Sequence, residues 1–398
     1  MLTDEQADLQ RLAREFAAAE LRPRAAAWDS VGEFPEGLFE ELAALGFLSM
    51  RVPPEEGGLG LDPVSSILVL TELSWGDASA GLAVAQHNCA VAEALARFGT
   101  EAQRGQWFPE LVSGARPGVI VSGEEDSGPA GVDPTALRAR RAGEEWILEG
   151  EVRGAVLGDR AGLFLVFAAM DSPGGKPAPV GSPDRSAFLV PREARGLTVA
   201  RTGRSLGLCA AGQARVNLDA VRLPPDALLG SVGEGGSVRA EVLAMARLGL
   251  AALSLGIAQA ALGHAARYAG EREQFGRVIA EFGGIREKLG GMVLRTDLVR
   301  EFLLAEGRRW AGIDRGEGGR ATPLAGERHE GAALAKVSAS EAAMWCADEA
   351  VQIFGGYGYM RDYPVEKLMR DAKGMEILFG PNDLLRGTLA EAALRRAE

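Results

Sequence analysis

Residues 351–373 read VQIFGGYGYMRDYPVEKLMRDAK, and the organisation of the chain can be worked out from this segment. It begins inside a helical pattern that spans Glu327 to Phe354. Gly355 and Gly356 follow, and glycine permits a tight turn or a close approach of the backbone to a ligand because it has no Cβ. The segment therefore predicts a long helix that ends in a glycine turn.

Two more long helical patterns lie upstream, over residues 238–271 and 282–311. Small residues dominate the first pattern between Ala251 and Ala261, which lets neighbouring helices approach closely. The Gly-rich stretch 312–319 links the later two patterns. The sequence thus predicts a C-terminal four-helix bundle over residues 231–398.

The first part of the chain, residues 1–117, is predicted to be a helical domain. Thr3 and Gln6 form a capping box ahead of an apolar helical pattern that must stop before Pro23. Four more helices are expected over residues 35–45, 63–75, 78–97 and 101–112.

Residues 118–230 have a different pattern, with short β-branched or alternating apolar runs separated by turn residues. The runs are residues 119–121, 137–140, 146–148, 164–167, 187–190 and 214–216. The stretch 171–185 is rich in Pro, Gly and Ser and is expected to form an exposed loop. We therefore expect a small antiparallel β-domain between two helical domains, which is an α+β fold.

Composition excludes several classes of function. The chain has 398 residues and a net charge of −12, which argues against a nucleic-acid partner. The three cysteines, an odd number far apart, suit reduced buried thiols, and the three histidines have no metal-ligand spacing, so no metal site is expected. No glycine pattern frames a serine as a hydrolase nucleophile.

The N-terminus opens with Asp4 and Glu5 and has no basic-then-apolar segment, so we expect no secretory signal and a cytoplasmic protein. We take Leu163 to Met170 as the longest uncharged apolar stretch, and it is far too short to cross a bilayer. We expect no membrane partner.

Five strings in order along nearly the whole chain resemble signatures of the acyl-CoA dehydrogenase family. They are EREQFG at residues 271–276, VQIFGGYGY at 351–359, YPVEKLMRDAK at 363–373, GGLGL at 57–61 and FGTE at 98–101. The chain is identified by resemblance as a member of this family.

The resemblance implies a flavin enzyme. Family members bind FAD between the β-domain and the C-terminal helices, with the ADP half across a subunit interface. A carboxylate removes the α-proton of an acyl-CoA thioester, hydride passes to the flavin, and electrons usually pass to an electron-transfer flavoprotein. By the same resemblance, residues 251–261 and the Gly355–Gly356 turn are expected at contacts of a homodimer or homotetramer.

The residues that would hold the ADP half are retained. They are Arg272, Gln274, Phe275, Gln352, Ile353, Phe354, Gly355 and Gly356. Arg272 matches the arginine that meets the pyrophosphate, and a guanidinium fork suits two phosphate oxygens. The alternative is that these residues only pack helices and form an oligomer, with Arg272 paired to an acid.

The residues that would hold the flavin ring depart from the family pattern. Val132 replaces a phosphate-binding hydroxyl within Gly131-Val132-Asp133, and Gly123-Glu124 replaces a Thr-Glu pair. Where the family has an aromatic residue, a Thr or Ser and an Asn, this chain has Gly154, Val156 and Leu157. Gly283 stands where a glutamine is usual.

The base position also departs from the family. Counting onward from Arg370-Asp371-Ala372-Lys373, Phe379 occupies the position of the catalytic glutamate and Pro381 that of a flavin-contacting threonine. Phenylalanine has no proton-accepting group, so it cannot act as a general base. Some members carry the base directly before the arginine that Arg247 matches, and that position is Ala246.

Two other residues near these positions are charged. Glu376, three residues before Phe379, is a weak candidate for a substitute base and is expected to face solvent or a neighbour. Arg247 resembles an arginine near the acyl-CoA channel and is a candidate substrate-binding residue, or else part of a structural ion pair.

Two functions therefore stay open. One is an FAD-dependent α,β-dehydrogenase of acyl-CoA or acyl-carrier thioesters with an unusual base and a loosened flavin site. The other is a non-catalytic relative that binds an acyl thioester or serves as a scaffold subunit. The coordinated loss of base, aromatic ring and hydroxyls favours weak activity or none, with FAD bound weakly or not at all.

Overall fold

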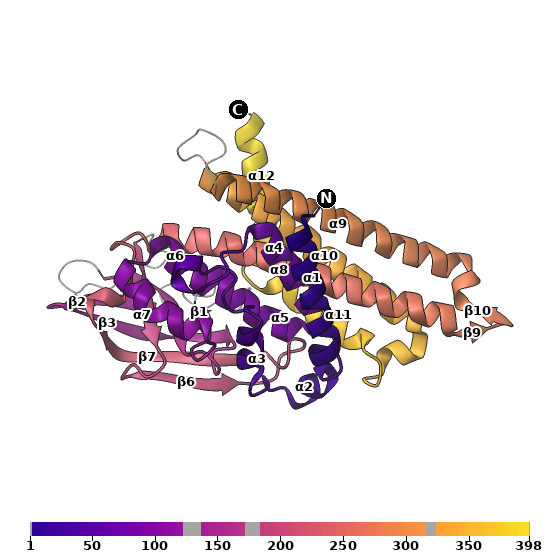
Figure 1. The fold of residues 1–398 in the computed structure, drawn as a ribbon, viewed down its shortest axis with the longest axis horizontal. Helices are drawn as coiled ribbons and strands as arrows, with labels where there is room; N and C mark the ends of the chain where they lie inside the picture. The colour runs from indigo at the N-terminus through magenta and orange to yellow at the C-terminus, as the bar shows by residue number, and fades with distance from the viewer. Residues whose placement is uncertain (1, 122–136, 172–183, 315–323, 398) are drawn as a thin grey trace.

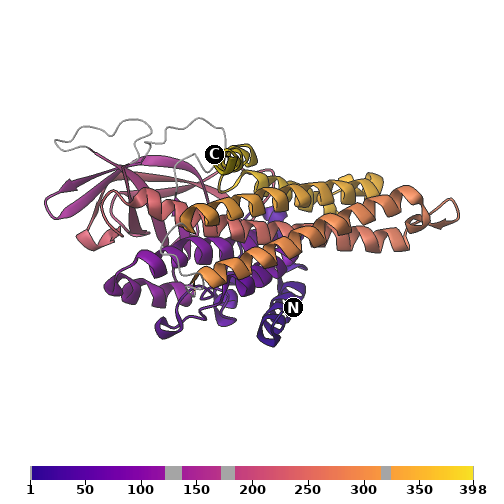
Figure 2. The same ribbon diagram turned by 90° about the horizontal axis from the view of Figure 1, so that it is seen from above.

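The computed structural model describes residues 2–121, 137–171, 184–314 and 324–397. Figures 1 and 2 show an elongated molecule with a β-sheet at one end and long helices that extend to the other end. The N-terminal helices cover one side of this arrangement. The predicted three-part architecture is confirmed.

The N-terminal domain consists of short helices, several of which begin at a capping side chain. The elements are α1 Asp4–Phe16, η1 Ala17–Leu21, α2 Ala25–Val31, α3 Leu38–Ala44, η2 Pro54–Glu56, α4 Pro63–Gly76, α5 Ala78–Ala85, η3 Gln86–Ala92, α6 Glu93–Phe98 and α7 Glu101–Val112. The predicted capping box of Thr3 and Gln6 is present, and Thr100 and Gln103 form a second one. The helix predicted over residues 78–97 is a continuous run with a π-helical segment, η3, in its middle.

The central domain is an eight-stranded sheet. Its strands are β1 Gly118–Val121, β2 Leu137–Ala142, β3 Glu145–Val156, β4 Leu163–Met170, β5 Arg185–Pro191, β6 Leu197–Thr202, β7 Gln213–Leu223 and β8 Leu228–Leu229, and a short helix η5 Pro225–Ala227 precedes β8. The order is β6-β7-β3-β2-β4-β5-β8, with β1 paired to β4.

The expectation of a purely antiparallel sheet was wrong, because β1 and β2 both pair with β4 in parallel. One edge of β3 pairs with β7 and the other with β2, so β4 lies beside β2 instead of beside β3. Alternation of apolar residues predicts strands but does not specify which strands pair. The loop expected over residues 171–185 and the link over 312–319 lie largely outside the described residues.

The C-terminal domain is a bundle of long helices. It comprises α8 Gly235–Glu271, β9 Glu273–Gln274, β10 Arg277–Val278, η6 Ile279–Glu281, α9 Gly283–Asp314, α10 Leu324–Phe354, η7 Gly355–Tyr359, α11 Val365–Ile377 and α12 Asn382–Ala397. The β9–β10 hairpin joins α8 to α9 at the end of the molecule farthest from the sheet (Figure 2).

The small residues of α8 do not form a surface between subunits, so the interface expected at residues 251–261 is corrected. Ala251, Ala258 and Ala261 are buried within the chain. A Cβ at Gly256 would collide with the carbonyl oxygen of Thr71 in α4. The small residues therefore allow α8 to pack closely against α4 of the same chain.

Helix α8 contains a longer apolar stretch than the one expected at residues 163–170. Within the described residues it is the one helix long and apolar enough to cross a membrane, and 83% of its apolar window is buried in the protein. The stretch from Leu163 to Met170 was therefore not the longest apolar segment. The burial of α8 identifies it as the core helix of the bundle.

Charged residues of α11 join the three domains. Lys367 donates to Asp77, the cap of α5, across 2.9 Å and to Asp371 across 2.7 Å. Asp371 in turn accepts from the backbone N–H of Leu208, before β7, across 2.6 Å. Arg370 pairs with Asp29 at the end of α2. The YPVEKLMRDAK string thus supplies the ion pairs that fix the domains around the site.

Candidate active-site pocket and nucleotide end

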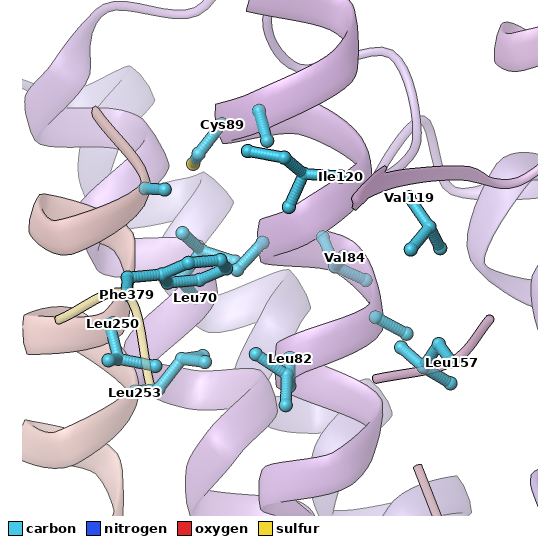
Figure 3. Packing of buried hydrophobic residues seen from close by; sticks show 14 of the residues in the cluster. Leu70, Leu82, Val84, Cys89, Val119, Ile120, Leu157, Leu250, Leu253 and Phe379 are labelled. Carbon is cyan, nitrogen blue, oxygen red and sulfur yellow. The ribbon is translucent and has the colours of Figure 1, made fainter. Parts of the chain in front are cut away.

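Phe379 lies between α11 and α12, and its side chain points into the protein. It is 7% exposed and has a φ of 54°, in the left-handed region that non-glycine residues rarely adopt. Figure 3 shows its ring among apolar side chains of α4, α5 and α8, with Leu70, Leu82 and Leu250 nearby. The residue at the expected base position is therefore part of the hydrophobic core.

Two cations hold the backbone of this segment. Arg247 of α8 donates from Nε to the carbonyl oxygen of Phe379 across 2.8 Å. Lys336 of α10, which is 0% exposed, donates to the carbonyl oxygens of Glu376 and Gly380 and to Oδ1 of Asn382, each across 2.8 Å.

Burial and the charge of Arg247 lower the pKa of Lys336 to about 7. Three acceptors at hydrogen-bond distance nevertheless match an ammonium group, which has three N–H donors and no lone pair. Lys336 is therefore arranged to fix the segment around Phe379 and not to accept a proton. Arg247 likewise contacts the backbone of the segment.

Beside Phe379 a cavity of about 30 Å³ remains. It is lined by Leu82, Gln86, Ile120, Val121, Val152, Gly154, Ala155, Val156, Leu378 and Phe379. A volume of this size holds roughly one water molecule. No carboxylate or hydroxyl side chain occurs among these lining residues, and removal of a proton from carbon requires a positioned base.

Glu376 does not line this cavity. Its carboxylate pairs with Lys373 one turn earlier on α11, and its side chain is partly exposed. Its backbone carbonyl is the group that faces the core, where it accepts from Lys336.

At the ring end, the described positions of β3 that match the family's ring contacts have no aromatic or hydroxyl side chain. Gly154, with a φ of 86°, and Val156 end β3, and Leu157 follows with a φ of 60° and a buried side chain. Gln86 donates from Nε2 to the carbonyl of Val156 across 3.1 Å, which closes η3 onto the strand. Residues 123–133, which carry the other expected ring contacts, lie outside the described part of the chain.

The expected nucleotide end is a separate pocket of about 830 Å³ at the β9–β10 hairpin. The structure brings most of the predicted ADP-contacting residues together there: Arg272, Gln274, Phe275, Ile353, Phe354, Gly355 and Gly356. Gln352 is exposed and does not line this pocket.

The surroundings of Arg272 suit an anion. Its guanidinium lies 5.5 Å from the centre of the Tyr357 ring, and among the described residues no carboxylate pairs with it. Gly355 and Gly356 face open space where a Cβ would project. A phosphate could therefore meet the arginine fork without steric hindrance from the glycine turn.

FAD thus fits one end of the expected site better than the other. Among the described residues, the expected nucleotide end offers a guanidinium with no paired carboxylate. The ring end offers mainly apolar side chains around a cavity of about 30 Å³, beside a cavity of about 270 Å³ that shares Val156 and Leu378 with it. The two ends are separate pockets that share no lining residue.

Sequence reasoning missed Lys336 and Gln86. Each had a signal, because Lys336 is an isolated cation within a run of apolar and small residues on a predicted helix. A lysine in such a position is buried only where several acceptors converge on it. Gln86 is likewise a polar residue within an apolar helix.

Comparison with known proteins gives consistent matches over the whole length. The model described as "Acyl-CoA dehydrogenase, N-terminal domain" matches residues 3–115, and "Acyl-CoA dehydrogenase, C-terminal domain" matches residues 233–394. An acyl-CoA dehydrogenase of Bacillus subtilis is 35% identical, with 97% of each chain covered. The bovine mitochondrial short-chain specific acyl-CoA dehydrogenase is 33% identical, covering 97% of this chain and 89% of the relative.

Solved structures agree with the sequence matches. Butyryl-CoA dehydrogenase from Megasphaera elsdenii superposes with a TM-score of 0.89 at 30% identity, and 99% of each chain is covered. This chain belongs to the acyl-CoA dehydrogenase family.

Proposed function

We propose that this chain is a non-catalytic member of the family, one that keeps the fold and a nucleotide-binding end but does not perform α,β-dehydrogenation. The observation that carries this proposal is the ring of Phe379, which occupies core space at the expected base position. A dehydrogenase of this family needs a carboxylate at this position or at that of Ala246, and room for the acyl chain beside it. Here the space contains a hydrocarbon ring and a cavity of about 30 Å³.

The retained nucleotide end supports a binding role. An unpaired Arg272 beside an open glycine turn suits a diphosphate, and CoA and FAD both contain one. We infer that the chain binds an acyl thioester or a related nucleotide weakly, or acts as a scaffold subunit for a catalytic relative. Cytoplasmic location is part of this proposal.

A homo-oligomer is also proposed, on surfaces other than the buried face of α8. Phe275, at the tip of the hairpin, is 93% exposed, and Val293, Leu294 and Leu298 form an exposed apolar patch on α9. Apolar side chains gathered in this way are typical of protein interfaces. A second copy is the occupant most consistent with the homo-oligomers that the family resemblance implies.

The second candidate is an active FAD-dependent dehydrogenase with a relocated base, which would pass electrons to an electron-transfer flavoprotein. It is favoured by the 35% identity to a protein named acyl-CoA dehydrogenase. Within the described residues near Phe379, Glu376 is the carboxylate that could take this role, and it would have to leave Lys373.

An anaerobic dye-reduction assay with added FAD and a panel of acyl-CoAs that begins with butyryl-CoA tests the proposal. We expect no turnover above the protein-free rate, and at best partial activity in Phe379→Glu. Robust turnover that Glu376→Gln abolishes, while Glu391→Gln on exposed α12 leaves it unchanged, would favour the second candidate.

A further inference from the structure

A second polar cavity lies away from the Phe379 pocket, between α2, the end of α4, α8 and the start of α11. Its volume is about 430 Å³, which is within the range of small-molecule sites. Small residues form part of its wall, among them Gly76, Ala78 and Ala260. The charged residues of the wall are the feature of interest.

Arg22 extends over the indole of Trp75, with its guanidinium carbon 4.0 Å from the ring centre. Its Nη2 lies 2.7 Å from Nε2 of His264, so Arg22 donates and the imidazole accepts. Among the described residues no carboxylate pairs with Arg22. Within the described part of the chain, the half-buried guanidinium of Arg22 is thus partnered by the neutral imidazole of His264 and by the indole face of Trp75.

The other charges of the wall do not compensate for Arg22. Asp29 and Glu366 pair with Arg370, and Asp77 pairs with Lys367. Asp362 is exposed and has no ion pair with Arg22 in the structure.

The pKa values of Arg22 and His264 also indicate that positive charge in this cavity is not balanced. Burial and the charges of Arg267 and Arg14 lower the pKa of Arg22, because its cation is unsupported. Burial and the charges of Arg22 and Arg267 lower the pKa of His264 to about 4, so the imidazole is neutral near pH 7. An anion in the cavity would relieve the repulsion among these groups.

We propose that Arg22, together with His264 and Trp75, forms a binding site for a small oxyanion, either a carboxylate or a phosphate. The fork of Arg22 still has N–H donors available after its contact with His264, and a planar guanidinium suits two oxygens of such a group. The small residues of the wall leave room for a short apolar body. The site is independent of the Phe379 pocket and of the proposed function.

Imidazole NMR of the full chain tests this site, because the protein contains three histidines. Inorganic phosphate, and separately sodium acetate, is titrated at constant pH and constant ionic strength. We expect a saturable shift of the His264 ring signals, with His87 and His329 unchanged as internal controls. The anion that saturates at the lower concentration identifies the preferred oxyanion.

Arg22→Gln should weaken the binding at least about tenfold, because it removes a charge-assisted hydrogen bond. Arg24→Gln is the matched control, since Arg24 pairs with Glu20 and Glu41 outside the cavity, and it should bind as the unmodified protein does. If circular dichroism shows that Arg22→Gln does not fold, His264→Gln is tested instead. Phosphate should then raise the melting temperature of the unmodified protein but not that of His264→Gln.

Shifts of equal size at all three histidines, or equal responses of the two arginine variants, would overturn the proposal. A His264 shift that follows protein concentration without added anion would also overturn it, because a second copy would then supply the group.

Discussion

The Nε–H of Arg247 donates to the backbone carbonyl of Phe379 across 2.8 Å, which ties α8 to the segment between α11 and α12. Lys336 binds the carbonyls on either side of the same residue. Both cations contact the backbone, so they fix the segment from which the ring of Phe379 projects into the core. The segment acts as a fixed wall of the cavity.

Truncation of Phe379 should therefore be costly. We expect Phe379→Ala to lower the free energy of unfolding by about 3–5 kcal/mol, the usual cost of removing a buried aromatic ring. Phe379→Gly should cost about 1 kcal/mol less than the alanine variant, because glycine adopts a φ of 54° without strain. Urea unfolding followed by circular dichroism measures both. Equal losses in the two variants, or losses below about 1 kcal/mol, would show that the ring is neither packed nor strained as described.

A buried ion pair in the N-terminal domain predicts a specific pH dependence. Burial alone would raise the pKa of Glu93, but the charges and hydrogen bonds of Arg51 and Arg97 outweigh it and lower the pKa from 4.5 to about 2. A lowered carboxyl pKa stabilises the folded state above the unfolded pKa, and this stability is lost as pH falls from about 4.5 toward 2. The contribution is about 3 kcal/mol.

Glu93→Gln should accordingly be less stable at pH 7 and show a flatter decline in stability between pH 5 and pH 3. The matched control is Glu391→Gln, an exposed change of the same kind. If the free energy of unfolding falls with pH in the same way for Glu93→Gln and the unmodified protein, Glu93 is not the source of this pH dependence.

FAD should bind weakly and mainly through its ADP half. The ring end lacks several polar contacts, and each lost contact of this kind costs roughly 1–3 kcal/mol. Titration of the purified protein with FAD, and competition with ADP, should give similar affinities for the two ligands. Arg272→Gln should weaken both, whereas Arg277→Gln, on the same hairpin but near Glu281, should not. Stoichiometric yellow flavin retained through gel filtration would show that the ring end binds tightly after all.

The chain should sediment as a dimer or a tetramer at micromolar concentration. The double variant Leu294→Glu with Leu298→Glu should shift it toward smaller species, because it places charges in the exposed apolar patch of α9. Leu394→Glu alters an equally exposed leucine on α12 and serves as control. A monomer in the unmodified protein would remove the support for a nucleotide site shared between copies.

Much of the fold followed from the sequence because caps and periodicity act locally. The bounds predicted for α7, residues 101–112, match the structure, in which Thr100 and Gln103 close the start of the helix with a capping box. Pairing in the sheet is a long-range property, and the parallel partners of β4 could not be read from alternation. Nor could the sequence distinguish small residues that pack α8 inside the chain from small residues at a subunit surface.

The sequence predicted some residues of the candidate site and missed others, because it carries local signals but not tertiary contacts. Neighbours in sequence, such as Gly355 and Gly356, carried a recognisable signature. The direction of a side chain is set by tertiary contacts, so the burial of Phe379 and the triple hydrogen bonding of Lys336 appeared only in the structure. The charged residues of the string at 363–373 proved to be contacts between domains.

Exchange of the α-proton of butyryl-CoA in D₂O is the most direct measurement, because it reports the presence of a base without requiring hydride transfer. Deuterium incorporation is followed by mass spectrometry with the unmodified protein, with and without FAD. The described residues that line the cavity beside Phe379 include no carboxylate, which predicts exchange at the rate of buffer alone under both conditions. Exchange well above that rate, lost in Glu376→Gln and retained in Glu391→Gln, would contradict the account and identify Glu376 as a relocated base.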